Sequence, residues 1–98
     1  KMRTLFIGED SGMHVNNFVW AYNVDTQRLT RILSLTAGAE STGLQVVENL
    51  NGHAYIMSNA QHHGDFPSTI NADLKKQLTP LIDKFDAPVG YIGGIPGL

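Results

Sequence analysis

The dipeptide Asn51-Gly52, which lies between two segments containing several apolar residues, constrains the fold of this chain more than any other feature. Both residues tolerate the positive φ angles of a type I′ turn, which joins two antiparallel strands through a two-residue loop. Residues 43–50 and 53–59 are therefore predicted to pair as a β-hairpin. Such a hairpin needs further strands beside it, because an isolated two-stranded hairpin is marginally stable at best.

The N-terminal half is also predicted to form antiparallel strands. Residues 3–9 are an apolar run that ends in glycine and acids. Residues 18–24 alternate large and smaller side chains, as a half-buried strand does, and a turn after them leads into a returning strand at 29–33. Residues 11–17 and 35–42 are expected to be loops. The pattern indicates antiparallel β structure from residue 3 to about residue 60.

A helix is predicted after residue 70, because apolar residues recur there at helical spacing: Leu74, Leu78, Leu81, Ile82 and Phe85. Asn71 is the expected N-cap. Pro80 is expected to kink or restart the helix, and residues 86–88 to end it. Residues 89–92 are a candidate last strand, and residues 93–97 are expected to be a flexible tail.

The predicted fold class is therefore mainly β with one C-terminal helix. Residues 54–58 repeat the pattern of residues 5–9. Strand-turn-strand units that recur roughly 40 to 50 residues apart suggest propeller blades. On this basis residues 1–98 form a single C-terminal fragment of one and a half to two blades, with hairpins and site loops in 1–65 and a helix and tail in 66–98. The alternative is a self-contained sheet of five or six strands with one helix across a face.

Composition excludes several classes of function. The net charge is −2 and the seven lysines and arginines are scattered, which argues against a nucleic-acid surface. The absence of cysteine excludes thiol catalysis, zinc fingers and disulfides within this chain. No apolar run approaches the roughly 20 residues of a membrane span. No signal peptide opens the chain, and we expect that it begins inside a fold.

Oxygen and imidazole groups gather in loops directly after two apolar strands. Residues 8–17 contain two acids, a histidine and two asparagines, and residues 58–65 contain Gln61, His62, His63 and an acid. Between them, residues 37–43 carry a single carboxylate, that of Glu40. Carboxylates, amide oxygens and imidazoles held on loops above strands are typical of a metal-assisted active site.

Each candidate ligand also has a structural interpretation. Glu40 has no cation near it in sequence, so it either ligates a metal or caps backbone amides in a turn. Glu9 and Asp10 point to opposite faces as neighbours on a strand, so only one of them is expected to reach a given site. We favour Glu9, against the alternative of a solvated turn.

The amides and imidazoles have the same two interpretations. Asn17 either offers an amide oxygen to calcium or makes its own local turn. Gln61 and His62 either orient substrate or a metal-bound water, or anchor the loop by hydrogen bonds. The other histidines are expected to be structural or exposed: His14, His53 and His63.

From Leu5 to Asp65, and again near its end, the chain resembles the C-terminal part of PhoX-type bacterial alkaline phosphatases. The matching segments are residues 6–10, the asparagine-rich turn before Trp20, and residues 23–26, 29–32, 37–43, 59–65 and 89–94. The resemblance implies a β-propeller phosphomonoesterase, periplasmic or secreted, with calcium and iron in a central site. It also implies that Glu40 is the best metal ligand here, followed by Glu9 and Asn17.

The chain differs from that family in two respects that affect the expected metal site. The family loop has proline where this chain has His63, and the family iron site uses a cysteine that this chain lacks. The rest of the site would come from an N-terminal region, so we expect the chain to contribute metal-site loops without hydrolysing a phosphomonoester or holding calcium or iron tightly by itself. The alternative is a non-catalytic β-rich assembly module that dimerises through exposed strand edges.

Overall fold

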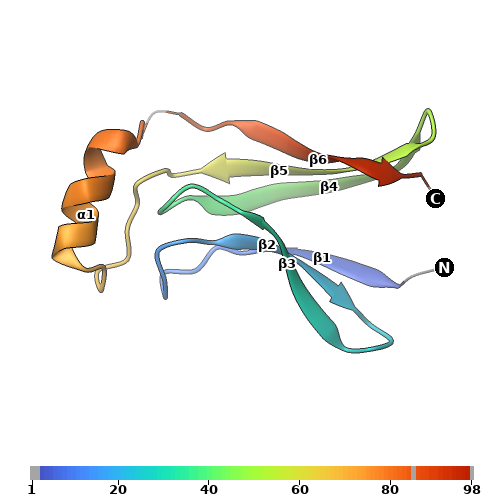
Figure 1. The fold of residues 1–98 in the computed structure, drawn as a ribbon, viewed down its shortest axis with the longest axis horizontal. Coiled ribbons are helices and arrows are strands. Elements are labelled where there is room, and N and C mark those ends of the chain that lie inside the picture. The colour runs from blue at the N-terminus through green and yellow to red at the C-terminus, as the bar shows by residue number, and fades with distance from the viewer. Residues whose placement is uncertain (1–2, 85, 98) are drawn as a thin grey trace.

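In the computed structural model, which describes residues 3–84 and 86–97, the chain forms two three-stranded antiparallel sheets and one short helix (Figure 1). The predicted mainly β fold with a helix near the C-terminus is confirmed at this level. The elements are β1 (Thr4–Gly8), β2 (Phe18–Asn23), β3 (Arg28–Ser34), β4 (Glu40–Leu50), β5 (His53–Gln61), α1 (Ala72–Leu78) and β6 (Val89–Pro96).

The first sheet has the order β1-β2-β3. Alternation in β2 places Phe18 and Trp20 on one face, where the guanidinium carbon of Arg31 lies 4.8 and 5.6 Å from their ring centroids. Val19 is on the other face and has no exposed surface. The alternation of large and small residues in the sequence therefore separates an outer aromatic face from an inner one.

The second sheet has the order β4-β5-β6, and its first two strands are joined at the predicted turn. Asn51 and Gly52 have φ angles of 52° and 86°, as a type I′ turn requires. The expected flexible tail is wrong for residues 93–96, which continue β6 along β5. This pairing satisfies backbone groups along an edge of β5 that would otherwise lack partners.

The two sheets meet along β1 and β4. The Ser41 amide donates to the Glu9 carbonyl at 2.9 Å, and the Ser41 and Ser58 hydroxyls lie 2.9 Å apart. A Cβ atom on Gly8 would lie 2.7 Å from the Ser41 hydroxyl oxygen. Small residues are thus required where the sheets approach each other most closely.

The helix is shorter than its apolar spacing predicts. Asn71 is the N-cap, as expected, and its side-chain oxygen accepts from the amides of Asp73 and Leu74. The α-helix ends at Leu78 and gives way to a 3₁₀ turn at Thr79–Leu81, because Pro80 cannot donate a helical hydrogen bond. Phe85, the last position of the expected pattern, lies outside the described residues. No helix among those residues has the length and hydrophobicity to cross a membrane.

Candidate functional site

Three loops meet at the end of the sheets that faces α1 (Figure 1). They are residues 9–17, 35–39 and 61–67, and we call this region the loop end. Backbone hydrogen bonds join them: the Gly38 amide donates to the Val15 carbonyl at 2.8 Å, and the Gly64 amide donates to the Ala37 carbonyl at 3.0 Å. The middle loop is therefore fixed between the other two.

Gly38 allows this close contact. Its φ angle is +79°, a conformation that side chains with a Cβ atom rarely adopt. A Cβ atom added there would lie 2.6 Å from the Asp65 amide nitrogen. No other residue fits at position 38 without displacing the loop that carries His62 and Asp65.

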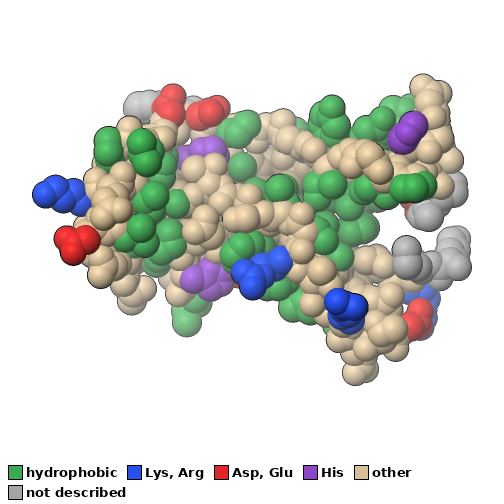
Figure 2. Space-filling view, in the orientation of Figure 1, with side chains coloured by type: hydrophobic (Ala, Val, Ile, Leu, Met, Phe, Trp, Pro, Cys, Tyr) green, Lys and Arg blue, Asp and Glu red, His purple; other side chains and the backbone are tan. Residues whose placement is uncertain are grey.

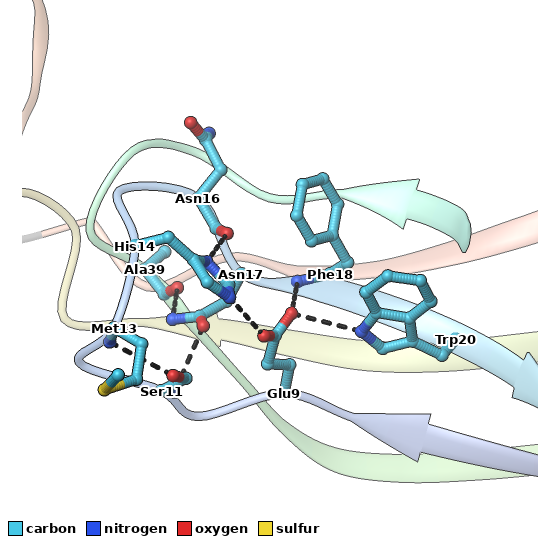
Figure 3. Close-up of polar contacts among 9 residues, drawn as sticks. All are labelled: Glu9, Ser11, Met13, His14, Asn16, Asn17, Phe18, Trp20 and Ala39. Carbon is cyan, nitrogen blue, oxygen red and sulfur yellow. Dashed lines mark hydrogen bonds and ion pairs between the residues drawn. The ribbon is translucent and has the colours of Figure 1, made fainter. Parts of the chain in front are cut away.

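The buried side chain of Asn17 connects the first two loops. It accepts from the Ser11 amide at 3.1 Å and donates to the Ala39 carbonyl at 2.9 Å (Figure 3). Both polar atoms of the amide are therefore engaged. The contacts favour the structural interpretation of Asn17 over its predicted role as a metal ligand.

Three potential metal ligands converge on the loop end: Glu40, His62 and Asp65. One ligand atom from each lies within 4.8 Å of the others. Glu40 is the first residue of β4 rather than part of the expected loop, and its Oε2 accepts from Gln61 Nε2 at 2.9 Å. Glu40, Gln61 and His62, which the sequence indicates as separate candidates, thus lie together across the β4–β5 pairing.

His62 and Asp65 are placed by a tight turn. His62 has a φ angle of 60°, and the Asp65 amide donates to the His62 carbonyl at 3.0 Å. Asp65 is part of the loop noted in the sequence but was not singled out as a ligand. Its position three residues after His62, in a segment rich in glycine and imidazole, is the signal that could have identified it.

Two hollows adjoin this group of ligands. One of about 140 Å³ is lined by residues from all three loops: Asp10, Ser11, Gly12, Asn17, Gly38, Glu40, Asp65, Phe66 and Pro67. The other, of about 540 Å³, is lined by Gln61, His62, His63, Asp65, Lys84, Asp86 and Ala87. Asp65 contributes to both hollows, so the group lies where they adjoin.

Several carboxylates lie close together at the loop end. Within residues 3–84 and 86–97, neither Glu40 nor Asp65 forms an ion pair with a lysine or arginine. Asp10 lines the same small hollow as both of them. A cation bound there would relieve the repulsion between these carboxylates.

Glu9 is turned toward a different set of partners. Its Oε2 accepts from the Phe18 amide at 3.0 Å and from the Trp20 indole at 3.1 Å, and its Oε1 lies 2.7 Å from His14 Nε2 (Figure 3). The predicted ligand Glu9 is therefore not part of the group formed by Glu40, His62 and Asp65. Its contacts join the first loop to the outer face of β2.

The three remaining histidines have separate positions. His14 pairs with Glu9, and His53 is exposed at the start of β5. His63 is buried and its Nε2 lies 3.1 Å from the Ala60 carbonyl, so its side chain anchors the loop. The expectation that these three are structural or exposed agrees with these positions.

Comparisons of the chain with protein-family models, with curated proteins and with solved structures found no match.

Proposed function

We propose that this chain is the C-terminal part of a PhoX-like, metal-dependent phosphomonoesterase that is periplasmic or secreted. The observation that carries the proposal is the convergence of three loops. Segments that resemble the family at residues 6–10, 37–43 and 59–65 contribute Asp10, Glu40 and Asp65 to the lining of one small hollow. These segments are far apart in sequence, and a shared site gives a reason for their meeting.

The two sheets support the propeller part of the proposal. They are antiparallel, lie side by side and have three strands each, whereas a propeller blade has four. Among the described strands, β3 and β6 each pair on one side only. A further strand from the rest of the protein would complete each sheet as a blade.

The ligands at the loop end fit part of the metal content that the resemblance implies. Imidazole and carboxylate groups suit iron, so Glu40, His62 and Asp65 would hold it. Calcium takes six to eight oxygen ligands, which these three residues cannot supply alone. When bound, such ions polarise the phosphoryl oxygens and promote ionisation of a bound water.

The residues of this chain would then position the phosphomonoester and the metal ligands. Gln61 holds the Glu40 carboxylate through its 2.9 Å hydrogen bond. Among the described residues that line the 540 Å³ hollow, Lys84 is the one lysine or arginine, and its ammonium group would attract a phosphoryl group. One lysine and part of a coordination sphere are insufficient for turnover, so we expect the isolated chain to be inactive.

Complementation tests this proposal. The C-terminal portion would be deleted from a PhoX-type phosphatase, and the inactive remainder would be mixed with this chain or with its Glu40→Gln variant. We expect the chain to restore metal-dependent hydrolysis of p-nitrophenyl phosphate and the variant to fail. The proposal fails if only the deleted portion of that enzyme restores activity, or if this chain hydrolyses the substrate at enzyme-like rates by itself.

A second candidate function is a non-catalytic assembly module that forms a homodimer. It is favoured by large apolar side chains on the surface, such as Leu29, Leu50 and Tyr91, which are 52%, 56% and 71% exposed. The one-sided pairing of β3 and β6 offers edges for association. Sedimentation at several concentrations tests it: a stable dimer without metal binding would favour the module over the phosphatase.

A further inference from the structure

We infer that Glu40, His62 and Asp65 form a site for one divalent first-row transition-metal ion, such as Zn²⁺, and that this site discriminates against Ca²⁺. The inference rests on the proposed function for its biological role, and it departs from the calcium that the resemblance implies. Its chemical basis is the identity of the three ligands and the way in which they are held.

The ligand atoms favour a transition metal. Imidazole nitrogen binds zinc, iron, nickel and copper well, whereas calcium prefers an all-oxygen shell. Glu40 already accepts a hydrogen bond from Gln61 on Oε2, which leaves Oε1 as its free oxygen. Bidentate binding by Glu40, of the kind that calcium sites often use, would have to engage the oxygen that already accepts from Gln61.

The spacing fits one ion rather than direct contacts between the side chains. The three ligand atoms lie within 4.8 Å of one another, yet His62 forms no ion pair with Glu40 or Asp65 among the described residues. Two ligand atoms of a tetrahedral zinc ion lie roughly 3.3 Å apart, given bond lengths of 2.0–2.1 Å. His62 and Asp65 are exposed, so modest side-chain rotation would close the remaining gap.

The scaffold fixes the backbone of these ligands. Glu40 begins β4, and the hydrogen bond from Gly64 to Ala37 ties the loop of His62 and Asp65 to the neighbouring loop. Three protein ligands leave a fourth position open to water, which is the arrangement of catalytic rather than structural zinc sites. The adjoining 540 Å³ hollow gives a phosphoryl oxygen access to that position.

Calorimetric titration of the full chain with ZnCl₂ and separately with CaCl₂ tests the inference. We expect Zn²⁺ to bind at 1:1 stoichiometry and at least about tenfold more tightly than Ca²⁺. His62→Asn, which retains a residue tolerant of positive φ, and Asp65→Asn should each weaken Zn²⁺ binding roughly tenfold or more. His53→Asn, far from the site at the start of β5, should change it less than about twofold.

Circular dichroism and urea unfolding of each variant would verify that it is folded. The inference is overturned if Ca²⁺ binds as tightly as Zn²⁺, if Zn²⁺ binding does not saturate, or if His53→Asn weakens binding as much as His62→Asn. Replacement of Zn²⁺ by Co²⁺ gives an independent readout, because its visible spectrum reports nitrogen and oxygen ligation. If the chain binds Zn²⁺ selectively but does not restore phosphatase activity, only the phosphatase proposal is contradicted. If it restores activity but does not prefer Zn²⁺ over Ca²⁺, only this inference is contradicted.

Discussion

The same two sheets are joined differently at their two ends. At the loop end, backbone hydrogen bonds such as the one from the Ser41 amide to the Glu9 carbonyl, and the buried side chain of Asn17, connect them. Toward the opposite end, which carries the Asn51-Gly52 turn and which we call the hairpin end, they border an apolar hollow of about 290 Å³. That hollow is lined by Thr4, Phe6, Val46, Glu48, Ala54, Ile56, Ile95 and Pro96.

Figure 2 shows hydrophobic side chains between the two sheets toward the hairpin end. The difference indicates how this small chain positions a site. Directional hydrogen bonds hold three loops in fixed places, and apolar packing alone would not specify their positions so closely. The hairpin end needs only to keep the strands in register, so loose packing is tolerated there.

Gly38→Ala should lower the stability of the chain most, because the added methyl group would clash with the Asp65 backbone at the loop end. The left-handed backbone costs roughly 1–2 kcal/mol for a residue with a Cβ atom, and the clash with the Asp65 amide adds to this. We expect a loss of at least about 2 kcal/mol in the free energy of unfolding, measured by urea denaturation. Gly12→Ala is the matched control, since a Cβ atom there has no neighbour within 4 Å. Equal stability of the two variants would contradict the described packing.

Asn17→Ala should come next. It removes the hydrogen bonds to Ser11 and Ala39 from a buried position, which typically costs about 1–3 kcal/mol. Asn16→Ala removes a single bond to the Leu35 carbonyl and should cost less. Thermal unfolding of both variants ranks them, and the reverse order would show that Asn17 is not the principal brace.

Glu9→Gln tests whether the Glu9 carboxylate has a structural role or binds the metal. It weakens the contacts to Trp20 and His14, so we expect a loss of about 1 kcal/mol in stability. Zn²⁺ affinity should change less than about twofold, because Glu9 is not part of the ligand group. A tenfold loss of Zn²⁺ affinity would restore Glu9 as the ligand that its sequence position predicts.

Val46→Ile should have the smallest effect, at the hairpin end. The added methylene extends into the apolar hollow and should stabilise the chain by no more than about 0.8 kcal/mol. Val46→Thr keeps the β-branched shape but replaces one methyl group by a hydroxyl, and it serves as the comparison. If Val46→Ile destabilises the chain appreciably, the hairpin end is packed more tightly than we describe.

Local signals in the sequence predicted most of the fold. Asn51-Gly52 specified its hairpin and Asn71 its helix cap, because both depend on neighbouring residues alone. The start of β4 at Glu40 and the full length of β6 were not predicted. Those boundaries are set by pairing with β5, which lies elsewhere in the chain.

The site was predictable only in part for a similar reason. The resemblance indicated Glu40 as a metal ligand, and His62 was expected only to orient substrate or a metal-bound water or to anchor its loop. The pairing of Glu40 with Gln61 explains why the two residues meet. Glu9 and Asn17 have equally suitable chemistry, but neighbouring donors occupy them: the Trp20 indole for Glu9 and the Ser11 amide for Asn17. Such competition depends on tertiary structure, and residue type and spacing do not reveal it.

The most direct test of the central claim is an NMR map of Zn²⁺ binding on the ¹⁵N-labelled chain. We predict amide shifts confined to the loop end (residues 9–17, 35–39 and 61–67) and to residues 40–43 at the start of β4, with the Asn51-Gly52 turn and β3 unchanged. Shifts centred on His53, shifts restricted to His14 and Glu9, or no shifts at saturating Zn²⁺ would contradict the claim that the loop end is a metal site.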